Sequence, residues 1–196
     1  MRQAEPPNVN PPIEFTTSRL RLRQWRSSDC GPFAELNADP RVMEFFPSTL
    51  APEASHVAVH RWQSQIAERG WGLWAAELRG TNEFIGFVGL QVPVAPLPFA
   101  PCVEVGWRLA HAHWGKGYAT EGARGALRVG FGRLELQEIV SFTAVNNVRS
   151  RAVMERLGMR EAESTFEHPS VPEGSPLRWH CLYRLSREQW AAHNTS

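Results

Sequence analysis

Trp114-Gly115-Lys116-Gly117-Tyr118-Ala119-Thr120-Glu121 is the stretch of sequence that decides the fold. It follows an apolar run over 102–109, which predicts a strand, and it opens a run over 120–133 that predicts a helix. The free N–H groups of a first helical turn and the helix dipole both favour an anion at that position. Gly115 and Gly117 carry no side chain that would keep a ligand away from the backbone. The stretch therefore predicts a site for a phosphate group.

The turn by itself leaves several phosphate-bearing ligands open. A nucleotide-binding P-loop needs Ser or Thr directly after its lysine, whereas Lys116 is followed by Gly117. A dinucleotide fingerprint needs Gly or Ala at its third small position, where this chain has Thr120. Such a fingerprint also usually lies near the N-terminus of a parallel unit, whereas this turn lies past the middle of the chain. Both matches are weak, and a glycine-rich turn that serves only packing is a further alternative.

Outward from this turn, hydrophobic patterning divides the chain into short elements. Alternating or apolar runs predict strands over 17–25, 71–79, 83–92, 102–109, 138–145, 159–166 and 179–185. Capping residues and helical periodicity predict helices over 28–38, 52–69, 120–133, 147–157 and 186–192. Strands outnumber helices, and several neighbouring strands form hairpins. We expect a three-layer α+β fold, with a mixed, mainly antiparallel central sheet of about seven strands and helices on both faces.

Composition limits the classes of protein and of partner. The chain has 196 residues, 42% of them hydrophobic and 21% charged, which suits a single domain over 14–196. Residues 1–13 are rich in Pro and Asn and are expected to form a disordered or loose arm. A net charge of +1 provides no broad basic field for nucleic acid. No apolar run is long enough to span a membrane, and the N-terminus lacks the apolar core of a signal peptide.

The cysteines indicate a reducing compartment. Cys30, Cys102 and Cys181 are odd in number, far apart in the sequence and without metal-ligand spacing. Free thiols of this kind are typical of cytosolic proteins. We therefore expect a cytoplasmic protein without a bound metal.

The second half of the chain identifies the phosphate-bearing ligand by resemblance. After the strand that ends at Val145 come Asn146-Asn147-Val148-Arg149-Ser150, a helix, and Leu157-Gly158-Met159. This order of motifs resembles the GNAT superfamily of acetyl-coenzyme A-dependent N-acetyltransferases, and within it the Rim-type (ribosomal-protein N-terminal) branch. Residues 17–23 resemble the first strand of that branch, and the resemblance covers roughly 15–190. Trp114 departs from the Arg or Gln of the wider superfamily, but the Rim-type branch often has an aromatic residue there.

This resemblance implies where acetyl-CoA binds. Backbone N–H groups of the turn would hold its pyrophosphate, from Gly115, Lys116, Gly117, Tyr118, Ala119 and Thr120. The edge of the preceding strand would pair with the pantetheine arm, through Val105, Gly106, Trp107, Arg108 and Leu109. Gly106 indicates a bulge or a close backbone approach, with ordinary packing as the alternative. Asn147 matches the position that hydrogen-bonds the pantetheine arm, and it also suits the N-cap of the following helix.

Catalysis requires a group that removes a proton from the ammonium form of the amine. Glu104 is the first candidate, because burial in an apolar strand beside Gly106 would raise the pKa of its carboxyl. The alternative is a strand residue that faces solvent or pairs with an arginine. Ser150 matches the position of the Rim-type acid, where its hydroxyl would hydrogen-bond the departing thiolate or else help cap the helix. His168 and His180 are weaker candidates near the acceptor side.

The resemblance implies acetyl transfer by direct attack in a ternary complex, with a protein N-terminus or a small-molecule amine as acceptor. A non-catalytic acyl-CoA-binding sensor would keep the turn without needing Glu104 or Ser150, and a nucleotide-binding enzyme would use the turn for ATP or NAD. The resemblance allows both monomers and dimers, and of these we expect a homodimer. Trp62, Trp71 and Trp74 are expected in the core, with lining of the acceptor pocket as the alternative for one or two of them.

Overall fold

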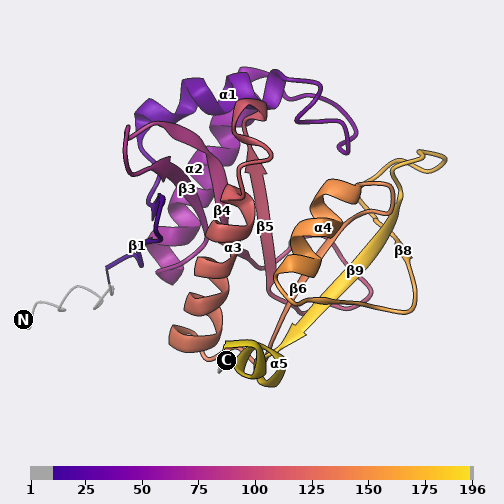
Figure 1. The fold of residues 1–196 in the computed structure, drawn as a ribbon. Coiled ribbons are helices and arrows are strands. Elements are labelled where there is room, and N and C mark those ends of the chain that lie inside the picture. The colour runs from indigo at the N-terminus through magenta and orange to yellow at the C-terminus, as the bar shows by residue number, and fades with distance from the viewer. Residues whose placement is uncertain (1–10, 195–196) are drawn as a thin grey trace, which may run out of the picture.

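A mixed β-sheet runs through the middle of the computed structural model, which describes residues 11–194 (Figure 1). The strands lie in the order β1-β2-β3-β4-β5-β6-β9-β7, and β8 also pairs with β9. Every pair is antiparallel except β5 with β6, as the sequence predicted. The strands are β1 (Phe15–Thr16), β2 (Leu20–Arg23), β3 (Leu73–Leu78), β4 (Phe84–Gln91), β5 (Glu104–Leu109), β6 (Glu138–Ala144), β7 (Arg160–Glu161), β8 (Phe166–Glu167) and β9 (Trp179–Ser186).

Two short exposed regions account for the difference between nine strands and the expected seven or so. The run over 159–166 forms β7 and β8 instead of one strand, because the residues between them are mostly exposed and have no apolar face to bury. At the other end of the sheet, Thr17 closes a turn between β1 and β2, where its hydroxyl accepts a 3.0 Å hydrogen bond from the N–H of Leu20. The predicted strand over 17–25 therefore shortens to β2.

Within the described residues, five α-helices pack on the sheet, at positions close to the expected ones. They are α1 (Cys30–Ala38), α2 (Pro52–Arg69), α3 (Tyr118–Arg128), α4 (Val148–Arg156) and α5 (Arg187–Asn194). Gly70 ends α2 in the left-handed conformation with φ of 80°, as its position after Arg69 predicted. The predicted helix over 120–133 is α-helical as far as Arg128 and ends in a π-helical turn, η3 (Val129–Arg133). In this turn Phe131 stacks on Trp190 of α5, with the ring centres 5.6 Å apart. No helix among residues 11–194 is long and apolar enough to cross a membrane.

The two faces of the sheet are covered by different helices. On β4, Phe87 lies 4.7 Å from the Trp62 ring of α2, whereas the next residue, Val88, lies under Gly122 of α3. Successive strand residues point to opposite faces, so α1 and α2 cover one face and α3 covers the other. An Arg124 hydrogen bond to the carbonyl of Arg156 joins α4 to α3 on that second face.

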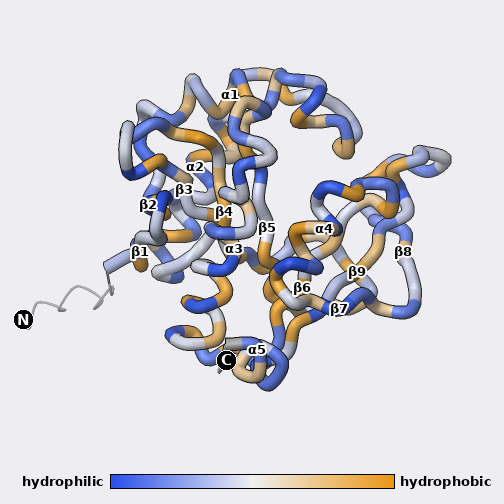
Figure 2. Tube along the Cα trace, in the orientation of Figure 1, coloured by the Kyte–Doolittle hydropathy of each residue, from blue (hydrophilic) through white to orange (hydrophobic). Residues whose placement is uncertain are grey.

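The core confirms the expected packing. One face of α3 and η3 packs on the sheet, with Ala123, Leu127 and Phe131 buried and Ala119 partly buried. Trp62 and Trp74 are buried on opposite faces, in accordance with core packing. Hydrophobic segments, orange in Figure 2, run along β4 and β6, and α3 alternates between hydrophilic and hydrophobic positions as an amphipathic helix does.

A buried ion-pair network joins β2 to the start of α1 and to β3. The Arg23 guanidinium donates to both carboxylate oxygens of Asp29, at 2.7 and 2.9 Å, and to Glu77 at 2.7 Å. All three side chains are only 2% exposed. Burial by itself would lower the pKa of Arg23, but the hydrogen bonds that its guanidinium donates to Asp29 and Glu77 raise that pKa above its usual value. The network therefore holds β2, the start of α1 and β3 together.

The N-terminal boundary of the packed region lies slightly earlier than expected. Residues 1–10 of the predicted arm lie outside the described residues. Ile13, which the sequence assigned to the arm, donates its N–H to Gly70 at 2.7 Å and accepts a 2.6 Å hydrogen bond from the indole of Trp74. These two bonds attach Ile13 to the domain because they satisfy backbone groups at the edge of the core.

The sheet splits between β5 and β6. β5 pairs with β4 at six positions, and β6 pairs with β9 at seven. Between them, β5 and β6 share the single register pair Glu104 and Val140. Figure 1 shows β5 running away from β6 and β9 beyond that pair. Since α3 connects these two strands, its N-terminus lies at the open end of the split.

Candidate active site

The split exposes one edge of β5. Val103 and Val105 direct their carbonyls toward β6, since the N–H of Val140 and the hydroxyl of Ser141 both donate to them at 2.9 Å. Backbone groups of a strand alternate in direction, so Trp107 and Leu109 share this direction, whereas Gly106 and Arg108 face β4. Beyond Glu104 the register gives β5 no partner in β6. Of the predicted strand positions, Trp107 therefore presents its backbone N–H and carbonyl to the split. Leu109 presents its N–H, because its carbonyl already accepts a 2.8 Å hydrogen bond from the Trp114 indole.

The glycine turn lies directly after this edge. Gly115 and Gly117 both adopt left-handed conformations, with φ of 73° and 80°. Gly117 is the N-cap residue of α3, so the N–H groups of Tyr118, Ala119 and Thr120 belong to its first turn. A Cβ placed on Gly115 would meet nothing within 4 Å. A Cβ on Gly117 would lie 3.4 Å from the Arg19 guanidinium, which is the end of a flexible side chain. The left-handed backbone, not close packing, therefore accounts for both glycines, and the turn fits a bound phosphate.

Arg19 braces the turn from outside. Its guanidinium donates to the carbonyl of Lys116 at 3.0 Å and to the carboxylate of Glu121 at 2.6 Å, and it lies 4.6 Å from the centre of the Tyr118 ring. Glu121 also accepts hydrogen bonds from the Thr17 hydroxyl at 2.6 Å and from the backbone N–H of Arg19 at 2.7 Å. The turn between β1 and β2 thus holds the backbone of the glycine turn in place. Lys116 itself is exposed.

Asn147 and Ser150 meet at the N-terminus of α4. The Asn147 side chain accepts a 3.2 Å hydrogen bond from the N–H of Ser150, which confirms the predicted N-cap. Its amide also donates to Thr143 at 2.8 Å and to the Ser150 hydroxyl at 3.2 Å. Because the Ser150 oxygen is already an acceptor, its own O–H is free to donate elsewhere.

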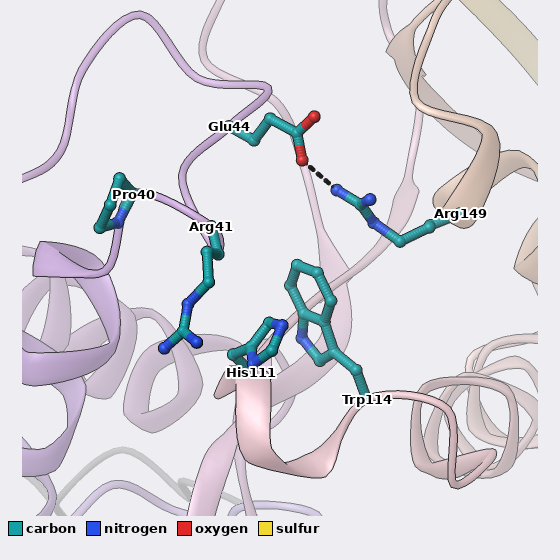
Figure 3. A pocket seen from close by; sticks show the side chains of 6 residues that line it. All are labelled: Pro40, Arg41, Glu44, His111, Trp114 and Arg149. Atoms are coloured by element: carbon teal, nitrogen blue, oxygen red, sulfur yellow. Dashed lines mark hydrogen bonds and ion pairs between the residues drawn. The ribbon is translucent and has the colours of Figure 1, made fainter.

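A pocket of about 370 Å³ lies between the two motifs (Figure 3). The connection between α1 and α2 forms one wall and the N-termini of α3 and α4 form the other. Arg149 points across it to an ion pair with Glu44, and its guanidinium lies 4.9 Å from the Trp114 ring. The lining residues are Pro40, Arg41, Glu44, His111, Trp114 and Arg149. Tertiary structure therefore brings the motifs around residues 114 and 149 to one cavity.

Glu104 lies at the vertex of the split, on the face covered by α1 and α2. It is 8% exposed, and its Oε2 accepts a 2.7 Å hydrogen bond from the Gln91 amide. Burial raises the pKa of Glu104 to about 7, although the Gln91 hydrogen bond acts in the opposite direction. A Cβ on Gly106 would lie 3.7 Å from Oε1, so the carboxyl lies beside that glycine. Glu104 neither faces solvent nor pairs with an arginine; its hydrogen-bond partner is neutral.

His168 and His180 lie further along the same face of the sheet. Their rings are 4.8 Å apart, and Phe142 of β6 lies 6.3 Å from His180. Burial lowers the pKa of both histidines, that of His180 to about 4. They are therefore neutral at pH 7 and belong to an aromatic cluster completed by Phe99 and Phe166.

Several residues of the site escaped the sequence analysis. Arg19 and Arg149 support the two motifs through partners that lie about a hundred residues away in the sequence, at Glu121 and Glu44. The Arg108 side chain was also missed, although a lone cation in an apolar strand is a recognisable signal. Within residues 11–194, no group of three or more His, Cys, Asp or Glu side chains can hold a metal ion.

Known proteins resemble this chain in both sequence and fold. Residues 19–160 match the family described as "Acetyltransferase (GNAT) domain". The FsC-acetyl coenzyme A-N(2)-transacetylase of Aspergillus fumigatus is 33% identical over 166 residues, covering 80% of this chain and 68% of that protein. The crystal structure of a GNAT-family acetyltransferase from Bacillus anthracis matches with a TM-score of 0.74 and 25% identity, over 90% of this chain and 99% of that one.

A Rim-type enzyme is among the proteins with this fold. The ribosomal-protein-S5-alanine acetyltransferase from Vibrio fischeri has a TM-score of 0.71 and 18% identity, over 91% of this chain and 98% of that one. At that identity the likeness concerns the fold alone. The family match, by contrast, includes the glycine turn, both strands of the split and the whole of α4. The chain therefore belongs to the GNAT family and is an acetyl-CoA-dependent N-acetyltransferase.

Proposed function

We propose that this enzyme acetylates a primary amine, on a protein N-terminus or a small molecule, by direct attack of the amine in a ternary complex. The observation that carries the proposal is the buried Glu104 carboxyl at the vertex of the split, with a pKa of about 7. A base with that pKa is half ionised at neutral pH, which suits proton removal from an ammonium group. The thioester of acetyl-CoA supplies the activated acetyl group.

The residues around the split fit acetyl-CoA. Trp107 and Leu109 offer backbone groups to an arm that carries amides like a peptide strand. The first turn of α3 offers N–H groups to the pyrophosphate, next to the left-handed Gly117. Asn147 lies at the facing helix terminus, where its side chain can reach the arm as well as cap α4.

Glu104 and Ser150 have different roles in the proposed reaction: Glu104 accepts a proton, and Ser150 stabilises the charge on the leaving group. Glu104 takes a proton from the ammonium form, so that the nitrogen lone pair becomes available. Ser150 donates its hydroxyl hydrogen bond to the departing sulfur, and Asn147 orients that hydroxyl by donating to its oxygen at 3.2 Å. A serine hydroxyl is a poor acid, so its role is to stabilise charge and not to transfer a proton.

An amine acceptor agrees with the name of the relative from Aspergillus fumigatus, a transacetylase of an N(2) nitrogen. We also propose a cytoplasmic location, in line with the free Cys30, Cys102 and Cys181 thiols. Homodimer formation stays a prediction.

Ligand-dependent thermal stability tests the donor side. Acetyl-CoA at a hundred times its Kd is expected to stabilise the protein by about 2.7 kcal/mol, which raises Tm by roughly 5–10 °C. ATP and NAD are expected to produce no comparable shift. The proposal would be contradicted if neither acetyl-CoA nor CoA raised the Tm, or if ATP raised it by the same amount. Thiol release in the presence of an amine panel then separates an enzyme from a sensor.

Gly117→Trp is expected to weaken acetyl-CoA binding at least tenfold, because the indole would occupy the phosphate position and φ of 80° disfavours any side chain. The binding constant from calorimetry checks this. Gly174→Trp is the matched control, since Gly174 also has a left-handed φ of 79° and open space around its Cβ position, in a loop far along the chain. Equal affinities of the two variants would argue against the turn as the pyrophosphate site.

A further inference from the structure

The Arg108 guanidinium is a cation without a counter-ion. Its Nη1 donates to the Asn37 side chain at 2.6 Å, and Nε is buried without a hydrogen-bond partner. No Asp or Glu within residues 11–194 forms an ion pair with it. The buried Arg23, by contrast, meets two carboxylates. Burial without compensation lowers the pKa of Arg108 to about 10.

Neighbouring residues hold this cation in one orientation. Asn37 is itself fixed, because its amide donates to the Ser55 hydroxyl at 3.0 Å. The Phe46 ring, from the connection between α1 and α2, lies 4.1 Å from the guanidinium carbon, and the Phe87 ring lies 5.6 Å from it. Such stacking fixes the plane of the guanidinium and excludes water from its faces.

One edge of the guanidinium is left to accept a ligand. With Nη1 committed to Asn37, the adjacent Nε and Nη2 hydrogens form a fork, and neither has a hydrogen-bond partner in the described part of the chain. A carboxylate matches such a fork through two parallel hydrogen bonds. An unpaired buried donor such as Nε is costly, so a ligand that accepted a hydrogen bond from it would gain affinity and selectivity.

Arg108 shares a face of β5 with the proposed base. Glu104 and Arg108 pair with Gln91 and Phe87 of β4, and Phe87 packs on α2, so both side chains lie on the side opposite α3. Four residues of extended strand separate their Cα atoms by about 13 Å. An extended small molecule can therefore place an amine near Glu104 and an anionic group toward Arg108.

We propose that Arg108 binds a carboxylate of the amine acceptor, so that the enzyme's preferred substrates are small amino acids or their derivatives and not simple amines. This inference rests on the proposed function, because it assigns the substrate class of the same site. Asn37 and Phe46 position the Arg108 guanidinium, and Arg108 alone makes the contact that distinguishes a carboxylate from a neutral group.

Matched pairs of acceptors test the assignment. The kcat/KM of the wild type is measured for 4-aminobutyrate and 6-aminohexanoate, and for the carboxamide of each. We expect the better carboxylate to exceed its carboxamide by about 10- to 100-fold, as one charge-assisted bidentate contact allows. Arg108→Met should abolish this preference, so that its kcat/KM values for a carboxylate and for the matching carboxamide lie within about threefold of each other. Arg108→Lys, which keeps the charge without the fork, should retain a smaller preference.

Arg61→Met is the matched control, because it removes the same charge from an exposed position of α2. It should keep the preference of the wild type. A wild type without any preference, an Arg108→Met enzyme that retains it, or an equal loss toward carboxylates and carboxamides would each overturn the assignment. The last result would indicate that Arg108 only supports the α1–α2 connection.

Direct binding keeps this inference separate from the proposed function. Calorimetry with 6-aminohexanoate, in the presence of CoA, should show binding to the wild type and at least tenfold weaker binding to Arg108→Met. Acetylation of neutral amines without a carboxylate preference would reject the Arg108 assignment and leave acetyl transfer intact. If the protein bound 6-aminohexanoate through Arg108 but failed to bind acetyl-CoA, the proposed acetyl transfer would be rejected and the Arg108 assignment would stand.

Discussion

Glu104→Gln is expected to lower kcat/KM for the amine acceptor by about 10²- to 10⁴-fold, the usual contribution of a general base. Glutamine keeps the shape of the side chain and a hydrogen-bond partner for Gln91, but it cannot accept a proton. The loss should therefore appear in the chemical step, while acetyl-CoA affinity stays near that of the wild type. Steady-state kinetics with the best acceptor from the amine panel, together with calorimetry for acetyl-CoA, checks both expectations.

The pH profile gives this prediction a second signature. Because Glu104 acts as a carboxylate with a pKa of about 7, the kcat/KM of the wild type should rise with pH through that value. In Glu104→Gln this rise should disappear, leaving only the titration of the acceptor amine itself. Glu163→Gln, at an exposed position, is the control and should keep the profile of the wild type. Unchanged turnover of Glu104→Gln at every pH would remove Glu104 from the mechanism.

Stability should change in the opposite direction to activity. Burial raises the pKa of Glu104 from 4.5 to about 7, so the native state binds more protons than the unfolded state between these values. Stability associated with Glu104 is therefore present below pH 4.5 and is lost as pH rises through 7. Glutamine carries no charge to bury, so the Tm of Glu104→Gln relative to the wild type should increase over this range. A lower Tm at pH 8 would indicate a structural role for the carboxylate.

Arg23→Met is expected to destabilise the fold by about 3–5 kcal/mol, because it leaves the buried Asp29 and Glu77 carboxylates without their main counter-ion. For a domain of this size, the corresponding fall in Tm is roughly 6–20 °C. Calorimetry or denaturant titration measures the loss. Activity per folded molecule should change little at low temperature, since the network lies outside the proposed catalytic groups.

Arg21→Met is the matched control for this second prediction. Arg21 lies on the same strand, two residues earlier, but its side chain is 46% exposed and its ion pair with Glu14 is long, at 3.4 Å. Exposed pairs of this kind contribute little to stability. If both variants unfolded at the same temperature, the Arg23 network would not be the connection between β2, α1 and β3 that its geometry indicates.

Much of the fold could be predicted because its signals are local. Gly70 ends α2 and Asn147 caps α4, as their positions next to periodic segments indicated. The strands with clear apolar patterns appear close to their expected bounds. The prediction was wrong for the single strand over 159–166, since its residues are exposed and tertiary contacts with β9 decide where they pair.

The candidate site was predictable to a lesser extent. The sequence pointed to Glu104 by its apolar neighbours, and the structure shows the burial that raises its pKa. It did not indicate which strand residues direct their backbone groups toward the split. The structure shows that Trp107 and Leu109 do so, whereas Gly106 and Arg108 face β4. That distinction depends on which neighbouring strand takes the intervening hydrogen bonds, and a strand's own sequence does not encode its partner.

The sequence by itself determined the local chemistry of this protein: left-handed glycines before a helix, an asparagine cap, and a carboxyl group and an arginine within an apolar strand. The tertiary structure alone decided where β5 leaves β6 and that Arg149 reaches Glu44 across the pocket. It also decided that Arg108 meets Asn37 and Phe46 but no carboxylate of residues 11–194. The physical reason is how far along the chain the interacting residues lie from one another. Backbone conformation and capping depend on neighbours a few residues away, whereas burial, pKa and ion pairing depend on segments that fold together from distant parts of the chain.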